Sequence, residues 1–218
     1  QSDFTADYFV NVKKYKRIVV LSDYSSYSAG LGDSTEASTK AIGGNVIFRG
    51  KVKSGTQNFT AVLTKVKSMK PDVIYYSGYY TDGGLIKAQQ AQLGIKADFV
   101  GGDSNDNPDF YKLAGKSAAG TVLINFPTPE ILPYPEAKKY LAAYKKAFKI
   151  DPPSIWPVTN ADGLRAVIEG VEQTKSFDTK KIADYVRTMK DFPGITGPFN
   201  IREDGERVGA KFVVYKLS

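Results

Sequence analysis

The chain has 218 residues, of which 42% are hydrophobic and 24% charged, proportions typical of a folded globular protein. It contains neither His nor Cys, which excludes disulfides, thiol nucleophiles, Cys/His zinc sites and His-based catalytic triads. The net charge of +7 is spread as pairs of lysines along predicted helices, so we interpret it as solvated surface and expect no nucleic-acid partner. No apolar run approaches the roughly 20 residues of a membrane-spanning helix.

Strands and helices alternate over the first 126 residues. An amphipathic helix is expected over about 4–14. Apolar runs predict strands at 17–21, 46–52, 72–77, 97–101 and 121–126, and helical spacing predicts helices at 29–42, 59–69, 85–93 and 109–114. Strands buried on both faces and joined by helices indicate an α/β fold with a doubly wound parallel sheet.

The pattern changes at Pro127-Thr128-Pro129. Helices are predicted at 136–149, 158–174 and 179–190, the last with Asp178 as its N-cap. The chain then breaks at Phe192-Pro193-Gly194 and is expected to end in a β-hairpin, with strands at 198–201 and 211–217 around a turn at 203–206.

Familiar cofactor and metal motifs are incomplete. The segment Gly30-Leu31-Gly32 follows the first strand as a dinucleotide fingerprint would, but its third glycine is missing and no acidic residue ends the second strand. The acidic run that starts at Asp103 has Pro108 and Ala114 where a calcium loop needs Gly and Glu. We therefore expect no cofactor and no metal.

Aromatic and acidic side chains follow three of the predicted strands. Tyr24 and Tyr27 come after the first, Tyr79 after the third, and Gly102 and Asp103 after the fourth. With the strand order 2-1-3-4-5 these loops meet at the ligand-binding edge of such a sheet. The tyrosine rings and the carboxylate suit a small ligand that is cationic at one end and apolar elsewhere. Two alternatives stay open: 14 tyrosines make loop tyrosines common, and Asp103 could cap the following helix.

Four segments, in order along the chain, carry a family resemblance. They are LSDYSSYSAG at 21–30, DVIYYSGY at 72–79, FVGGD at 99–103 and GITGPF at 194–199. Over essentially all its residues the chain resembles the type I periplasmic binding proteins, specifically the branched-chain amino acid (Leu/Ile/Val) binding proteins of ABC importers. The resemblance implies two α/β lobes, of flavodoxin-like strand order, joined by three crossovers and closing on a ligand.

The resemblance also implies roles and boundaries. Tyr27 and Tyr79 correspond to rings near the bound amino acid, and Asp103 to the acidic residue that takes its α-ammonium group. Ala161 stands where the family often has an aromatic pocket residue. Residues 1–126 with 197–218 would form lobe two, and 127–196 a helical remnant of lobe one. The N-terminal part of lobe one, roughly 100 residues, would be missing.

The function expected from this resemblance is that of a solute-binding protein of an ABC importer, periplasmic or membrane-anchored outside the cell. It would bind a small amino acid by hinge closure and deliver it to the importer's membrane permease subunits. The apolar helix faces within 127–196 would be covered by the missing segment or by a second copy. The alternative is the ligand-sensing domain of a receptor or regulator. No paired catalytic constellation is visible, so we do not expect an enzyme.

Overall fold

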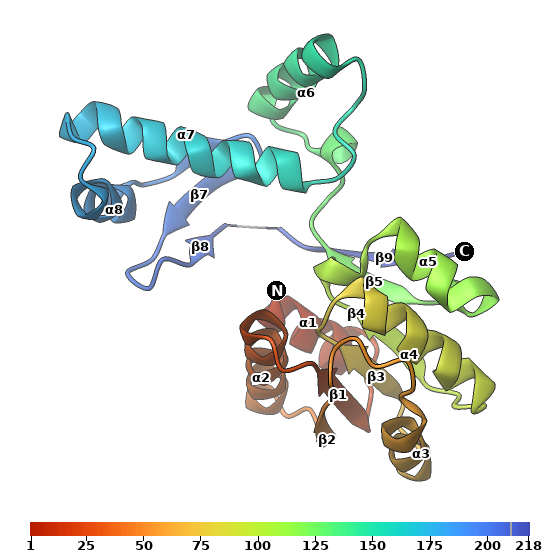
Figure 1. Ribbon diagram of the computed structural model, residues 1–218. Helices are drawn as coiled ribbons and strands as arrows, with labels where there is room; N and C mark the ends of the chain where they lie inside the picture. Colours follow the sequence, from red (N-terminus) through yellow and green to blue (C-terminus); the bar gives the residue numbers. More distant parts are fainter. Residues whose placement is uncertain (210) are drawn as a thin grey trace. The chain divides into compact units, whose positions relative to one another are not determined.

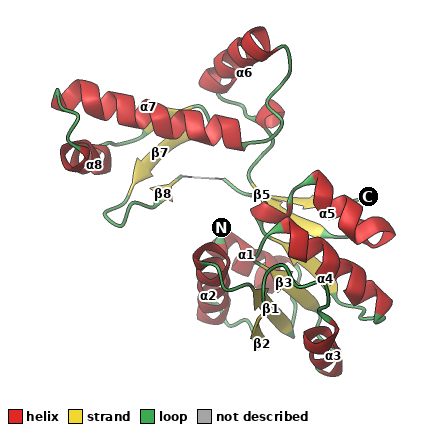
Figure 2. Cartoon of the chain, in the orientation of Figure 1, coloured by secondary structure: helices red, strands yellow, loops and turns green. Residues whose placement is uncertain are grey.

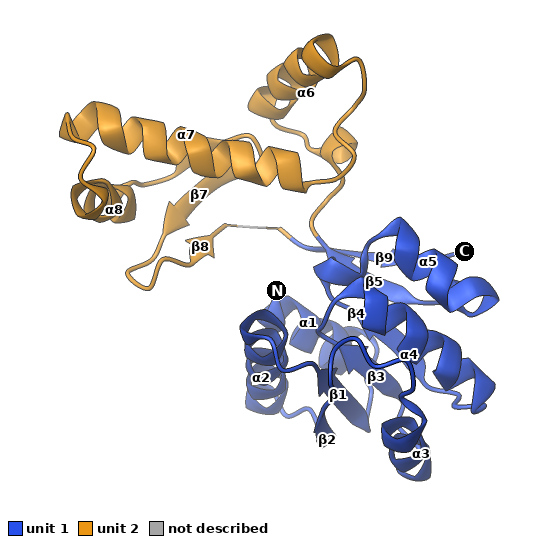
Figure 3. Cartoon of the chain, in the orientation of Figure 1, with its two compact units in different colours: residues 1–125, 212–218 blue, residues 126–211 orange. Residues whose placement is uncertain are grey.

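The computed structural model describes residues 1–209 and 211–218, which form two compact units. Unit 1 comprises Gln1–Asn125 with Phe212–Ser218, and unit 2 comprises Phe126–Lys211 (Figure 3). Within the described residues, no helix has both the length and the apolar character needed to cross a membrane.

Unit 1 is built on a six-stranded sheet with the order β2-β1-β3-β4-β5-β9 (Figure 1). The strands are β1 Ile18–Ser22, β2 Val46–Lys51, β3 Val73–Tyr76, β4 Asp98–Gly101, β5 Val122–Asn125 and β9 Val213–Lys216. Strands β1 to β5 are parallel, which confirms the predicted order 2-1-3-4-5. The sheet is not wholly parallel, because β9 runs antiparallel to β5 and pairs with its exposed edge.

Helices cover both faces of this sheet, as expected for a doubly wound fold (Figure 2). On one face lie α1 Ser2–Asp7, which continues as a π-helical turn over Tyr8–Val12, and α2 Ser26–Ala41. On the other lie α3 Thr60–Ser68, α4 Tyr80–Gln92 and α5 Pro108–Ala114. Short 3-10 turns span Asp103–Asn105 and Gly115–Ala118. Alternation along β3 sends Tyr75 to the α1 face, against Phe9, and Tyr76 to the α3–α5 face.

Unit 2 is mainly helical. It contains a 3-10 turn at Pro129–Ile131, the helices α6 Pro135–Phe148, α7 Trp156–Thr174 and α8 Thr179–Thr188, and a small antiparallel sheet of β6 Phe192–Gly194, β7 Gly197–Ile201 and β8 Arg207–Val208. The predicted cap of α8 is confirmed, because the Asp178 carboxylate accepts hydrogen bonds from the backbone N–H groups of Lys180 and Lys181.

The C-terminal hairpin differs from the prediction. Its first strand, β7, is present, but β7 pairs with β6 and with the two-residue β8, so residues 197–208 belong to unit 2. The segment predicted as its second strand, 211–217, instead supplies β9 to the sheet of unit 1. The chain thus leaves unit 1 after 125 and returns at 212, where the sequence had predicted a return at 197. Without β9, strand β5 would be an edge strand with unpaired backbone groups. It offers four residues for pairing, whereas β7 and β8 pair over only two.

Candidate functional site

Three loops at the carboxyl edge of the unit 1 sheet bring two tyrosines and one carboxylate together. The Tyr27 hydroxyl, at the start of α2, donates a hydrogen bond of 2.7 Å to Oδ1 of Asp103, which follows β4. The ring of Tyr79, which follows β3, lies 5.4 Å from the ring of Tyr27 at an interplanar angle of 40°. The strand order explains the meeting, because β1, β3 and β4 are neighbours.

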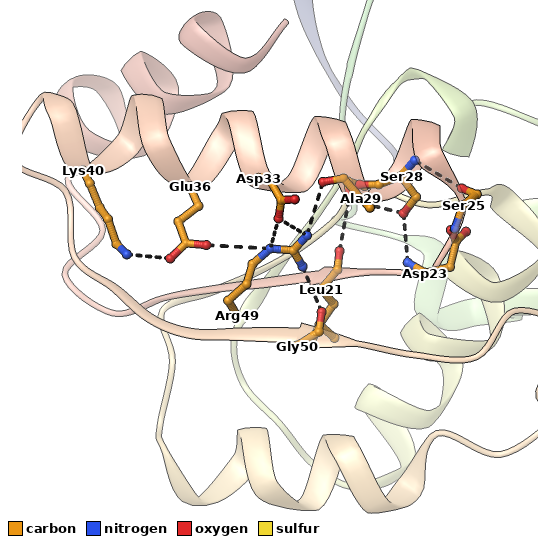
Figure 4. Close-up of polar contacts among 11 residues, drawn as sticks. Leu21, Asp23, Ser25, Ser28, Ala29, Asp33, Glu36, Lys40, Arg49 and Gly50 are labelled. Atoms are coloured by element: carbon orange, nitrogen blue, oxygen red, sulfur yellow. Dashed lines mark hydrogen bonds and ion pairs between the residues drawn. The ribbon is translucent and has the colours of Figure 1, made fainter.

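A serine network fixes the first turn of α2, which carries Tyr27 (Figure 4). The hydroxyl of Ser25, the N-cap, accepts from the backbone N–H of Ser28 at 3.2 Å, and the Ser28 hydroxyl accepts from the N–H of Asp23 at 2.9 Å. Asp23 in turn accepts from the N–H of Ser25 at 2.7 Å. These bonds satisfy helix-end donors that would otherwise be unpaired, and they set the direction in which Tyr27 leaves the helix.

Arg49 fastens the same helix to the edge strand β2. Its guanidinium donates to the Asp33 carboxylate at 2.9 Å and to the carbonyl oxygen of Gly50 at 2.9 Å (Figure 4). It also lies against Gly32. A Cβ at Gly32 would lie 2.5 Å from an Arg49 nitrogen, so the glycine makes room for this anchor.

The two residues that follow Asp103, Ser104 and Asn105, hold the loop that carries Tyr79. The Ser104 hydroxyl and the Asn105 side-chain amide each donate a 2.8 Å hydrogen bond to the carbonyl oxygen of Gly78. The helix that follows, α5, is capped by Asn107, whose side chain accepts from the N–H of Asp109. Asp103 therefore does not cap that helix, which was the alternative role left open by the sequence.

The electrostatics of the pair keep the phenol neutral. Burial, and then the negative charge of Asp103, raise the pKa of Tyr27 well above its usual range. The phenol therefore acts as a hydrogen-bond donor to the carboxylate. Asp103 is only 6% exposed, and within the described part of the chain its Oδ2 oxygen has no hydrogen-bond partner. One carboxylate oxygen is thus positioned by Tyr27 while the other can accept a proton donor from a ligand.

The other two candidates lie differently. Tyr24 is 69% exposed, and among the described residues no hydrogen bond or ring contact joins it to Tyr27, Tyr79 or Asp103, so the structure does not bring it into the cluster. Gly102 is buried, and a Cβ there would lie 3.3 Å from a Leu31 side-chain carbon. The structure therefore gives Gly102 the role of allowing close packing directly before Asp103.

Sequence reasoning did not assign a site role to Ser104 or Asn105. Both belong to the acidic and amide-rich run after β4, of which only Gly102 and Asp103 were taken as candidate site residues. Hydroxyl and amide side chains in the same loop as a candidate carboxylate were the available signal, because such groups hold loops through local hydrogen bonds.

Comparison with known proteins places the whole chain in one family. Residues 1–218 match the family described as periplasmic binding protein. The chain belongs to that family. This is a family of binding proteins and not of enzymes, in agreement with the expectation from the sequence.

Among its curated relatives, this periplasmic binding protein is 28% identical over 217 residues to the Leu/Ile/Val-binding protein BraC3 of Rhizobium johnstonii and 27% identical over 215 residues to the Leu/Ile/Val-binding protein of Escherichia coli K12. Each alignment covers 99% of this chain. The chain spans 58% and 57%, respectively, of the length of these two relatives.

Solved structures agree on the fold. A leucine-binding protein, LivK, from Thermotoga maritima superposes with a TM-score of 0.88 at 30% identity, covering 100% of this chain and 62% of that one. The protein LivJ of Streptococcus pneumoniae, solved in complex with isoleucine, gives a TM-score of 0.75 at 26% identity, covering 99% and 65%.

In this periplasmic binding protein the position next to Ala161 has a structural role. Asp162, on α7, is 1% exposed and accepts hydrogen bonds from the N–H of Thr196 at 3.0 Å, from its hydroxyl at 2.6 Å and from the N–H of Ile195. Arg207 lies 3.6 Å from the same carboxylate. Asp162 therefore holds the turn between β6 and β7.

Proposed function

We propose that this chain is part of a solute-binding protein of an ABC importer and that it binds a small amino acid at the carboxyl edge of unit 1. The observation that carries the proposal is the buried Asp103 carboxylate, with Oδ1 engaged by Tyr27 and Oδ2 available. The family and the similarity to Leu/Ile/Val-binding proteins support it.

The residues divide the recognition between them. The Asp103 carboxylate accepts the α-ammonium group, and this charge-assisted bond is strong because the group is nearly buried. Tyr79, 42% exposed, presents its ring to the ligand's carbon atoms, and Tyr27 packs against that ring. An aromatic surface beside one carboxylate suits an ammonium ligand with an apolar side chain, such as the isoleucine bound by the Streptococcus protein.

Unit 1 supplies one wall of this site, and we propose that the rest of the full-length protein supplies the opposite wall. In this assignment unit 1 is lobe two and unit 2 is part of lobe one. Helix α7 exposes Leu164 by 61% and Val167 and Ile168 by 47% each, an apolar stripe that further polypeptide would cover. That polypeptide is an N-terminal segment or, failing that, a second copy of the chain.

The family supports an extracytoplasmic location. We propose that the protein is periplasmic or membrane-anchored and that the permease subunits of the importer receive the ligand. The permease would recognise the form in which the lobes are closed on the ligand, and the binding protein would catalyse no chemical step.

Calorimetry of the full-length protein against a panel of amino acids, sugars and aromatic acids tests the function. We expect binding of Leu, Ile or Val, and a loss of 30-fold or more in affinity for Asp103→Asn, because the ammonium group then loses its countercharge. Asp109→Asn is the matched control, since within the described residues that carboxylate pairs with the exposed Lys112 alone. Binding of sugars or aromatic carboxylates alone, or an unchanged affinity for Asp103→Asn, contradicts the proposal.

A further inference from the structure

The two edges of the unit 1 sheet differ strongly in charge. The segments that enter β1, β3, β4 and β5, together with Lys67 in the last turn of α3 and Lys216 at the end of β9, carry nine cationic side chains and two carboxylates among the described residues. We call these cations the basic edge: Lys13, Lys14, Lys16, Arg17, Lys67, Lys70, Lys96, Lys116 and Lys216. The loops that leave β1 to β4 at the opposite edge carry three carboxylates, Asp23, Asp103 and Asp106, and one lysine, Lys53, and Lys51 ends β2.

Contacts between neighbouring segments show that the basic edge is continuous. Arg17 donates to the carbonyl oxygens of Met69 and Lys70, which joins the entry to β1 with the entry to β3. The ammonium group of Lys67 donates to the carbonyl oxygen of Leu93 at 2.7 Å, ahead of β4. Lys216 pairs in register with Val122 at the start of β5. The cations therefore follow one edge of one sheet across its width.

The two carboxylates at this edge are already engaged. Asp72 accepts the backbone N–H groups of Lys16 and Arg17 at 2.7 and 2.9 Å. Asp98 accepts a hydrogen bond from the Tyr15 hydroxyl and lies 3.3 Å from the ammonium group of Lys13. These two carboxylates offset only two of the nine positive charges of the basic edge.

The fold needs only some of these charges. A cation near the C-terminus of a helix is favourable, and Lys67 in the last turn of α3 and Arg17 beside its final carbonyls fit that explanation. It does not extend to Lys16 and Lys96, which lie two residues before β1 and β4, or to Lys216, which is the last residue of β9. Lys14, Lys16, Lys70, Lys96 and Lys116 are all exposed to solvent.

We propose that the basic edge docks the protein on a membrane surface that carries anionic phospholipid headgroups. Eight of its nine cations are lysines distributed over five segments, and the single arginine is committed to backbone carbonyls. Distributed point charges of this kind suit a diffuse layer of phosphates, whereas one fixed phosphate or a nucleic-acid base favours the planar arginine fork and aromatic stacking. Each lysine near such a surface strengthens binding about fivefold.

Docking in this way leaves the candidate ligand site free. Asp103 lies at the far end of the parallel strands, and strands of four to six residues separate the two edges by roughly 15–20 Å. The protein would be concentrated at the membrane while its Tyr27–Asp103 edge stays in solution.

Co-sedimentation of the full-length protein with phospholipid vesicles tests the proposal. We expect binding to vesicles of 30% phosphatidylglycerol and 70% phosphatidylcholine at 25 mM NaCl, release at 500 mM NaCl, and no binding to pure phosphatidylcholine. The fourfold variant K14Q/K16Q/K70Q/K96Q should bind the anionic vesicles at least 100-fold more weakly.

The variant K138Q/K139Q/K146Q/K190Q removes the same charge from exposed positions of unit 2 and serves as the matched control. Absence of vesicle binding by the wild type overturns the proposal, and so does an equal loss in the two variants, because net charge alone would then explain it. Binding to double-stranded DNA but not to vesicles, lost in the first variant, assigns the edge to nucleic acid and also overturns it. Amino-acid affinity, measured in parallel, should be the same in both variants and the wild type.

Discussion

The phenol of Tyr27 and the carboxylate of Asp103 form a 2.7 Å hydrogen bond that joins the loop after β1 to the loop after β4, 76 residues apart in the chain. The bond spans the position of β3, which lies between those strands. The bond therefore ties two loops of the sheet edge together, and it also positions the carboxylate of the candidate ligand site.

Tyr27→Phe should destabilise the folded protein by about 1–3 kcal/mol, because it removes the donor to a nearly buried carboxylate and keeps the ring. Chemical denaturation measures the change. Tyr24→Phe is the control. Because the Tyr24 ring is largely exposed, loss of its hydroxyl should leave stability unchanged. Equal effects of the two substitutions would show that the Tyr27–Asp103 bond contributes nothing.

Stability should fall in alkaline solution because several buried phenols resist ionisation. Burial, and then the charge of Asp106, raise the pKa of Tyr111 to about 12, and burial is also the main cause of the raised pKa of Tyr15, Tyr27 and Tyr76. The folded-state pKa lies above the unfolded value near 10, so the unfolded chain loses these protons first. The stabilisation is therefore complete below about pH 10 and is lost as the pH rises toward 12 and beyond.

Absorbance at 295 nm, followed together with circular dichroism, measures this behaviour. We expect a group of tyrosines to ionise only as the secondary structure is lost, whereas all should titrate near pH 10 in concentrated urea. Complete ionisation by pH 11 in the folded protein would contradict the assignment of these phenols as buried and neutral.

Asp162→Asn should destabilise unit 2 by about 3 kcal/mol, because Arg207 loses its nearly buried countercharge and the β6–β7 turn loses an acceptor. Hydrogen exchange of the Ile195 and Thr196 amides should rise together with the loss of stability. Asp184→Asn on α8 removes an exposed carboxylate of the same unit and should change neither quantity appreciably. Protection of both amides in the Asp162 variant would argue against the clamp.

Two helices of unit 2 end on lysines in the left-handed conformation, which favours glycine. Lys149 has φ of 64° after α6 and Lys175 has φ of 50° after α7. Lys149→Gly and Lys175→Gly should each stabilise the protein by about 0.5–1 kcal/mol, measured by denaturant unfolding. Lys146→Gly, inside α6, should instead cost about 1 kcal/mol. Destabilisation at both C-terminal positions would show that the lysine side chains contribute more there than the backbone strain costs.

The sequence by itself determined the parallel core of unit 1. Continuous apolar runs such as Ile18–Leu21 and Val73–Tyr76 are buried on both faces, and the helices between them force right-handed crossovers, so the element types and the parallel sheet follow from local pattern. The order 2-1-3-4-5 is the one that the family resemblance implies. The meeting of Tyr27, Tyr79 and Asp103 follows from that order, because loops after neighbouring parallel strands share an edge.

Only the tertiary structure decided which partners the remaining groups take. The segment at 213–216 could extend the terminal hairpin or pair with β5, and local pattern is the same for both. Tyr24 and Tyr27 are equally aromatic and three residues apart, yet only Tyr27 meets Asp103. Nothing in the local sequence marks Asp162 as the buried acceptor that it is in the fold. Long-range pairing depends on which donors and acceptors are left unpaired once the core has formed, and that competition has no local signature.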